Sequence, residues 1–194
     1  MKARILFSSL LLFVFSLSLG PSAFAADTRL IPFAVGYSFV FHASNGTNSW
    51  EEKMTSSGMT SIPSALQYYT VDASTQLGTG TRSLRSTPTT VYQYAGFGKE
   101  TVFWKTGAAG TTWKYTEGDG KIIEKKIVAL NQTVTVPYGT FTGCIKYQNR
   151  CTNCFGNTQW TEWIKPGFMM VKWQDYWSGG DTPTVHELIS VTTP

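Results

Sequence analysis

The stretch VTVPYGTFTGCIKYQNRCTNCFGNTQWTEWIKPGFMMVKW, residues 134–173, contains all three cysteines and three of the seven tryptophans of the chain. Apolar and polar residues alternate over residues 141–147, which is the period of a half-buried strand. The pair Pro166-Gly167 predicts a reversal into another strand. The stretch therefore predicts three consecutive antiparallel strands.

The chain before this stretch repeats the same pattern in shorter pieces. Alternation begins at Phe33, and Asn45-Gly46 predicts a hairpin because both residues tolerate positive φ. A small polar run at residues 78–81 is predicted to end the strand before it, and a polar connector is predicted to follow over residues 82–88. No long window keeps a helical repeat of apolar residues. We expect an all-β fold with minor helix, built as a single antiparallel sheet in meander order.

Several motifs of the C-terminal half belong to one pattern. They are Val134-Thr135-Val136-Pro137-Tyr138-Gly139-Thr140-Phe141, then Cys144-Ile145-Lys146, and Trp163-Ile164-Lys165-Pro166-Gly167 with Val171-Lys172. Together they resemble a family of exported bacterial domains of unknown function, grouped with LolA/LolB-like lipoprotein carriers and lipocalin-like sheets. Lys165 departs from the pattern, because a small residue is usual there. The resemblance implies a strongly curved sheet or half-barrel with an apolar concave face, and it brings no catalytic residues.

The first residues have the features of an export signal. A basic start precedes an apolar run over residues 5–19, and Ala23-Phe24-Ala25 supplies small residues at a cleavage site. The run is shorter than the ~20 residues that cross a bilayer, so we expect no transmembrane span. We predict a signal peptide at 1–25 and a single β domain at 26–194, in the periplasm or outside a bacterial cell.

Charge and composition restrict the partners. The whole chain has a formal charge of +4, and two of its basic residues lie in the predicted signal. The remaining charge is too small for nucleic acid to be the main partner, since nucleic acid selects dense basic patches. The basic residues Lys121, Lys125 and Lys126, with Glu124 among them, are predicted to be a solvated strand face. The oligomeric state is left open.

The three cysteines predict a disulfide, since an exported protein folds in an oxidising compartment. Cys151 and Cys154 have redox-motif spacing but lie between two predicted strands, where no helix dipole lowers a thiol pKa. All three pairings are open: Cys144–Cys151, Cys144–Cys154 and Cys151–Cys154. A bond from Cys144 to one of the other two is preferred, because it closes the larger ring. No metal site is predicted, since a second CxxC or CxxH pair is missing.

No catalytic constellation is visible. His42 and His186 are far apart in sequence, and no GxSxG elbow is present. Glu162 and Glu187 are predicted to be solvated strand residues. We expect a non-enzymatic protein without a cofactor; a hydrolase is the weaker hypothesis, which a cleft that brings a histidine to a carboxylate would favour.

The aromatic residues are the remaining candidates for function. A curved sheet with more aromatic rings than its thin core needs is typical of a cleft for an apolar ligand, such as a lipid or a lipidated partner. The predicted lining is Trp113, Phe141, Trp163, Met169, Val171 and Trp173. The alternative hypothesis is a structural or interaction module of the cell envelope or surface that pairs through exposed strand edges.

Overall fold

The structure is a computed structural model that describes residues 28–61, 66–76, 78–154, 158–176 and 182–194. The predicted signal peptide, residues 1–25, lies outside the described residues. The described part contains strands and turns and no helix. It therefore also lacks any helix that is long and apolar enough to cross a membrane.

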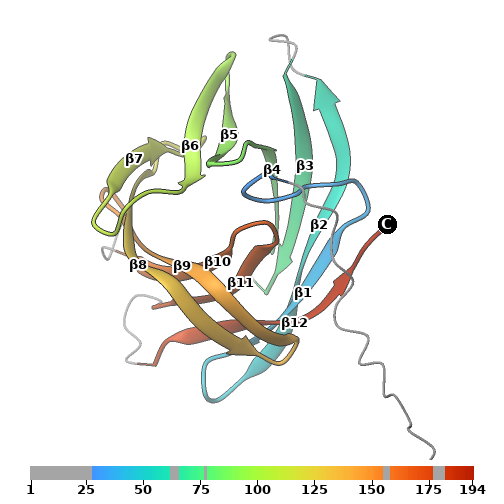
Figure 1. Ribbon diagram of the computed structural model, residues 1–194, viewed down its shortest axis with the longest axis vertical. Helices are drawn as coiled ribbons and strands as arrows, with labels where there is room; N and C mark the ends of the chain where they lie inside the picture. Colours follow the sequence, from blue (N-terminus) through green and yellow to red (C-terminus); the bar gives the residue numbers. More distant parts are fainter. Residues whose placement is uncertain (1–27, 62–65, 77, 155–157, 177–181) are drawn as a thin grey trace, which may run out of the picture.

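Twelve antiparallel strands form one sheet in the order β6-β5-β4-β3-β2-β1-β12-β11-β10-β9-β8-β7. Each strand pairs with its neighbours in sequence except β6 and β7, which are the two edges, and β12 pairs with β1 (Figure 1). The strands are β1 Ser38–Ser44, β2 Ser49–Ser61, β3 Gln67–Thr75, β4 Gly78–Ser86, β5 Thr90–Gly96, β6 Lys99–Lys105, β7 Thr112–Thr116, β8 Ile122–Val136, β9 Gly139–Cys151, β10 Gln159–Lys165, β11 Met169–Asp175 and β12 Thr184–Thr192. The predicted all-β meander is confirmed.

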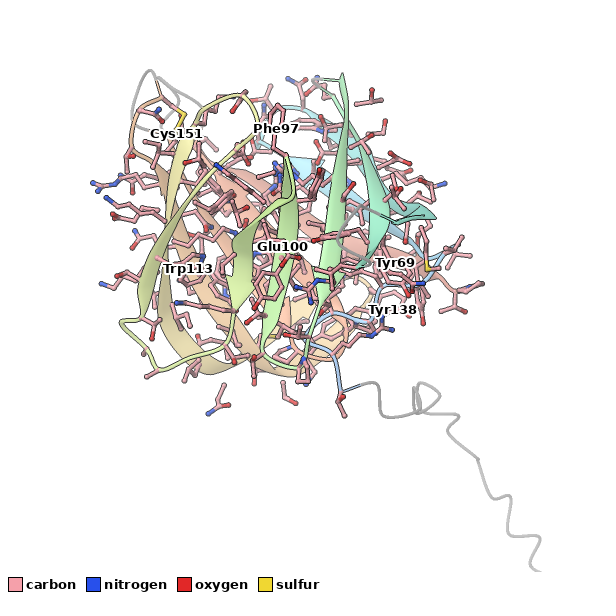
Figure 2. The ribbon with its side chains drawn as sticks, turned by 90° about the horizontal axis from the view of Figure 1, so that it is seen from above. Tyr69, Phe97, Glu100, Trp113, Tyr138 and Cys151 are labelled. Carbon is pink, nitrogen blue, oxygen red and sulfur yellow. A yellow bond between two sulfur atoms is a disulfide. The ribbon has the colours of Figure 1, made fainter. Side chains whose placement is uncertain are left out.

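The sheet curves until its two edge strands, β6 and β7, come close to each other. The indole Nε1 of Trp113 on β7 donates a hydrogen bond of 3.0 Å to the carbonyl of Val102 on β6. Seen from above, the strands surround a central space filled with side chains, with Trp113 and Tyr69 at opposite sides (Figure 2). The sheet is thus nearly closed, and its concave face is the interior of the molecule.

The segment before β1 closes one end of this interior. Leu30, Ile31 and Phe33 are all buried in the core. The backbone N–H of Leu30 donates to the carbonyl of Thr87 beyond β4, and its carbonyl accepts from Gly167 in the turn between β10 and β11. The strand that was predicted to begin at Phe33 therefore begins only at Ser38, because the preceding residues leave the sheet to cover its end.

The residues predicted as a polar connector form β4, so that prediction is wrong. Leu84 is its single fully buried apolar side chain. The polar side chains have partners within the sheet: Arg85 Nε and Nη2 donate to the carboxylate of Glu100 on β6 at 2.9 and 2.8 Å. Paired polar groups thus replace the apolar alternation that ordinarily identifies a strand.

Candidate functional site

A cleft of about 550 Å³ opens into the interior at the end opposite the Leu30 segment. Its rim is formed by Lys121 in the turn after β7, by the Cys151 to Cys154 loop, and by Tyr176 after β11. Its walls are largely aromatic and aliphatic, and they are made by Phe103, Tyr115, Ile123, Trp160, Met170 and Trp173. Such a volume and lining are typical of a small-molecule site.

The floor of the cleft contains a buried ion pair. Lys125 on β8 is fully buried, and its Nζ lies 2.9 Å from Oε2 of Glu162 on β10. Lys125 is buried because it lies between Ile123 and Ile127, at every second position, on the face of β8 that points inward. Sequence position alone thus places a cation in the core.

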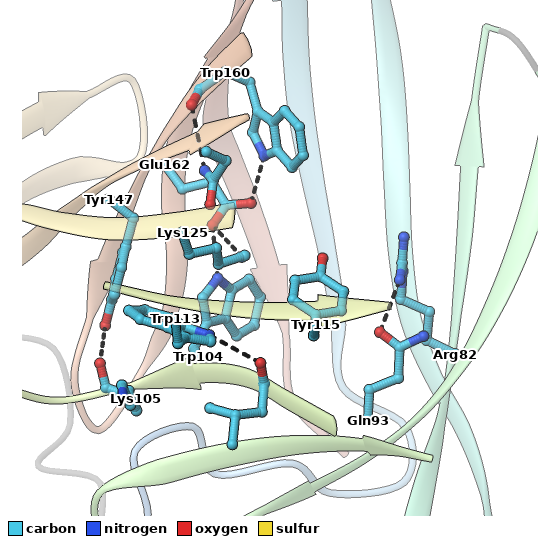
Figure 3. Close-up of polar contacts among 12 residues, drawn as sticks. Arg82, Gln93, Trp104, Lys105, Trp113, Tyr115, Lys125, Tyr147, Trp160 and Glu162 are labelled. Atoms are coloured by element: carbon cyan, nitrogen blue, oxygen red, sulfur yellow. Dashed lines mark hydrogen bonds and ion pairs between the residues drawn. The ribbon is translucent and has the colours of Figure 1, made fainter. Parts of the chain in front are cut away.

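Aromatic groups surround this ion pair (Figure 3). Lys125 Nζ lies 4.5 Å from the centroid of the Phe103 ring and 5.1 Å from that of Trp104. The indole of Trp104 donates to Glu162 Oε2 at 2.7 Å, and that of Trp160 donates to Oε1 at 2.8 Å. The carboxylate therefore has three donors, which satisfies both of its oxygens.

The two charges shift each other's titration. Burial alone raises the pKa of Glu162, but the Lys125 charge and the hydrogen bonds from the two indoles outweigh burial and hold the pKa below its ordinary value. Burial lowers the pKa of Lys125, and the Glu162 charge offsets part of that effect. Because Glu162 keeps its negative charge, the pair acts as one neutral unit.

A second ionic cluster lies further along the same sheet, on β2, β11 and β12, and Trp173 is paired between Glu162 and His186. Nδ1 of His186 lies 3.0 Å from Oε2 of Glu52, and its Nε2 lies 3.4 Å from Oδ2 of Asp175. Burial alone lowers the pKa of His186, but the contacts with Asp175 and Glu52 outweigh burial and raise it. The two carboxylates therefore favour the protonated form of the ring.

Trp173 connects this cluster to the cleft. Its ring stacks on His186 with centroids 4.0 Å apart and planes 11° apart, and it meets Phe41 edge-on at 4.7 Å. Trp173 and Asp175 both line the cleft. The stacking fixes the indole in place as part of the cleft wall.

This cluster is less completely satisfied than the first. Oδ1 of Asp175 and Nε2 of His186 are both buried, and neither has a hydrogen-bond partner among the described residues. The 3.4 Å approach of Nε2 to Oδ2 is an ion pair without hydrogen-bond geometry. The Asp175 side chain as a whole is 21% exposed and lines the cleft, so its carboxylate can be approached from there.

The position of His186 beside carboxylates is what the hydrolase hypothesis required, but the chemistry differs. A general base needs a ring nitrogen with a free lone pair directed at the substrate. Both nitrogens of His186 face carboxylates of this chain, and these contacts raise its pKa. The arrangement favours a structural or binding group over a general base.

The cysteines pair differently from the preferred expectation. Cys151 and Cys154 form a disulfide with Cα atoms 5.5 Å apart, and Cys144 is free and buried. Cys144 and Cys151 lie seven residues apart on the uninterrupted strand β9, about 23 Å at ~3.3 Å per residue. A disulfide spans no more than about 7 Å between Cα atoms, so that pairing is wrong.

The six residues predicted to bind an apolar ligand are distributed over different regions. Trp173 lines the cleft, while Met169 and Val171 are buried in the core. Trp113 lies at the seam between β6 and β7. Phe141 packs against Phe168, with ring centroids 5.1 Å apart.

Trp163 lies across from Lys146 on the neighbouring strand, and its ring is 4.9 Å from Lys146 Nζ. It alternates with Glu162, whose side chain points inward, so Trp163 faces the outside. Ligand binding by this set of six stays a prediction, and the geometry brings only Trp173 to the cleft.

Two residues of the site were predicted to be solvated, and both predictions are wrong. Lys125 and Glu162 are both buried, with side chains 0% and 8% exposed. The signal that identifies Lys125 was present, since it shares a strand face with Ile123 and Ile127. The sequence held no comparable signal for its partner on β10.

The comparisons with known proteins support the fold. The sequence matches no family model and no curated protein. A crystal structure of a Bacteroides fragilis protein, described as exported and as having a YmcC-like fold, superimposes with a TM-score of 0.57 at 12% identity, covering 85% of this chain and 99% of that one. A protein from Parabacteroides distasonis, described as a lipoprotein, gives 0.54 at 14% identity with the same coverage. At these identities the likeness establishes a shared fold alone.

Proposed function

We propose that the protein is an exported, non-enzymatic binding protein that holds an apolar or amphipathic ligand, such as a lipid or a lipidated partner, in the cleft. The observation that carries this proposal is the aromatic and aliphatic wall of a cleft of about 550 Å³. Apolar walls with few polar groups favour ligands that bury hydrocarbon and keep one polar end.

The proposed compartment has three supports. The first residues have the pattern of a signal peptide. A disulfide between Cys151 and Cys154 is typical of an oxidising compartment. The two proteins that share the fold are described as an exported protein and a lipoprotein. The motif resemblance to LolA/LolB-like carriers agrees with a role in the cell envelope.

Tryptophan fluorescence tests ligand binding, because Trp160 and Trp173 line the cleft. Adding fatty acids or phospholipids to the purified protein is expected to shift the emission. Replacing both residues by Phe is expected to remove most of the shift. Trp163→Phe, on the outer face, is the matched control and is expected to keep it. No shift with any lipid would contradict the proposal.

The alternative is an interaction module, and one observation favours it. The edge strands β6 and β7 are the ends of the hydrogen-bonded sheet order, so each keeps backbone groups that a further strand can pair with. Phe97, at the tip of the β5–β6 hairpin, is 101% exposed. Stable oligomers in sedimentation experiments, with no lipid-dependent fluorescence shift, would favour this function instead.

A further inference from the structure

The charges around the cleft differ in whether they are already neutralised. Nη1 of Arg82 lies 2.9 Å from Glu117, and Nζ of Lys121 lies 2.6 Å from Asp119. The third cation, Lys125, faces Glu162 at 2.9 Å. Each cation at the cleft therefore has a carboxylate of this chain, and an anionic ligand group meets no unpaired positive charge.

The cluster of Glu52, His186 and Asp175 is the exception. Two carboxylates share one histidine ring, so the cluster has more carboxylates than it has groups that can carry a positive charge. Oδ1 of Asp175 is buried at the cleft without a donor. A buried charge and a buried acceptor that lack partners are both unfavourable until a donor supplies the missing contact.

The surroundings of Asp175 suit a cation. The indole of Trp173, two residues earlier on β11, lines the same wall, and the Trp160 ring lines the cleft as well. Ammonium groups bind favourably over aromatic faces, with tryptophan the strongest of these. Carboxylate and indole together form the two halves of an ammonium site.

We propose that the cleft recognises its ligand by a primary ammonium group, which donates to the carboxylate of Asp175 beside the Trp173 ring while the hydrocarbon part lies against the apolar walls. This inference rests on the proposed function and adds the chemical class of the ligand's polar end. A primary ammonium group is preferred because Oδ1 needs an N–H donor as well as a positive charge.

Three amphiphiles with the same chain test this: dodecylammonium, dodecanol and dodecanoate, each below the concentration at which it forms micelles. Dissociation constants are measured by calorimetry at neutral pH. Dodecylammonium is expected to bind about tenfold more tightly than dodecanol, and dodecanoate more weakly than both. Asp175→Asn is expected to reduce dodecylammonium to the affinity of dodecanol and to leave dodecanol unchanged.

Asp119→Asn is the matched control, because it removes the same charge from the exposed turn near the rim and is expected to keep the preference. An equal loss of dodecylammonium affinity in Asp175→Asn and Asp119→Asn would overturn the inference. It would show a general electrostatic attraction and no specific site. Dodecanol binding with no preference for the amine would overturn the inference and leave the proposed function standing. If none of the three binds, both are overturned.

Discussion

Two buried ionic clusters lie on the same part of the sheet, on either side of Trp173, and they differ in completeness. In the first, Glu162 accepts hydrogen bonds from Lys125 and from two indoles, so the pair is neutral and satisfied. In the second, His186 is shared by Glu52 and Asp175, and one buried oxygen of Asp175 lacks a donor. A satisfied network fixes the fold, whereas an unsatisfied one at a cleft is suited to binding.

The largest effect is expected from breaking the first cluster. Lys125→Met leaves Glu162 buried without its counter-charge, which is expected to lower the free energy of unfolding by about 3–5 kcal/mol. Urea unfolding followed by tryptophan fluorescence measures this. Lys126→Met, at the exposed neighbouring position, is the control, with a change within about 0.5 kcal/mol. An equal loss of stability in Lys125→Met and Lys126→Met would show that the first cluster does not stabilise the fold.

The disulfide beside the cleft is expected to have the next largest effect. The small ring between Cys151 and Cys154 predicts a loss of about 2 kcal/mol for Cys151→Ser in the chain-entropy model. Cys144→Ala is the control: thiol labelling of the unfolded, non-reduced protein should find one free thiol in the wild type and none in this variant. A labelled Cys151 or Cys154 in the wild type would contradict the assigned pairing.

The second cluster is expected to make stability depend on pH. The raised pKa of His186 gives a contribution that is complete below its unfolded value of 6.5 and is lost as the pH rises through the folded value. The lowered pKa of Glu52 gives a contribution that is present above 4.5 and is lost as the pH falls through the folded value. The cluster therefore contributes most to stability between pH 4.5 and pH 6.5.

Urea midpoints measured from about pH 5 to about pH 9 test this contribution. His186→Gln is expected to reduce the loss of stability on the alkaline side, because the titrating ring is gone. An unchanged pH profile in His186→Gln would show that the imidazolium is not held by the two carboxylates.

The smallest effect sets the baseline for both clusters. Lys172 and Glu187 form an ion pair of 2.7 Å with side chains 24% and 30% exposed. Lys172→Ala is expected to change the free energy of unfolding by no more than about 1 kcal/mol, because water screens such pairs. A loss as large as that of Lys125→Met would show that burial does not separate the two kinds of pair.

Alternation and turns predicted the all-β meander, because most strands have one apolar face directed at the core. They did not predict β4, because its polar side chains bind groups on other strands: Arg85 donates to Glu100 on β6, 15 residues further along the chain. The position of Cys144 was also mispredicted. The alternation over residues 141–147 puts it on the face opposite Ile145, but Gly143 has φ of 72° and the pairing shifts nearby, so Cys144 and Ile145 are both buried.

The candidate site was harder to predict than the fold, because its members lie on strands far apart in sequence. Parity on β8 identifies Lys125 as buried, but nothing local to it identifies Glu162 as its partner. Glu52 and His186 are separated by 134 residues and meet only because β12 pairs with β1 beside β2. Of the six residues that were predicted to line a cleft, only Trp173 on β11 does so.

The most direct test is the urea midpoint of wild type and Asp175→Asn, each with and without saturating dodecylammonium. A binding role for Asp175 predicts that the variant alone unfolds within about 1 kcal/mol of wild type, since it relieves an unneutralised buried charge. It also predicts that the amine stabilises the wild type more than the variant. A variant as unstable as Lys125→Met, or equal stabilisation of both proteins by the amine, would contradict that role.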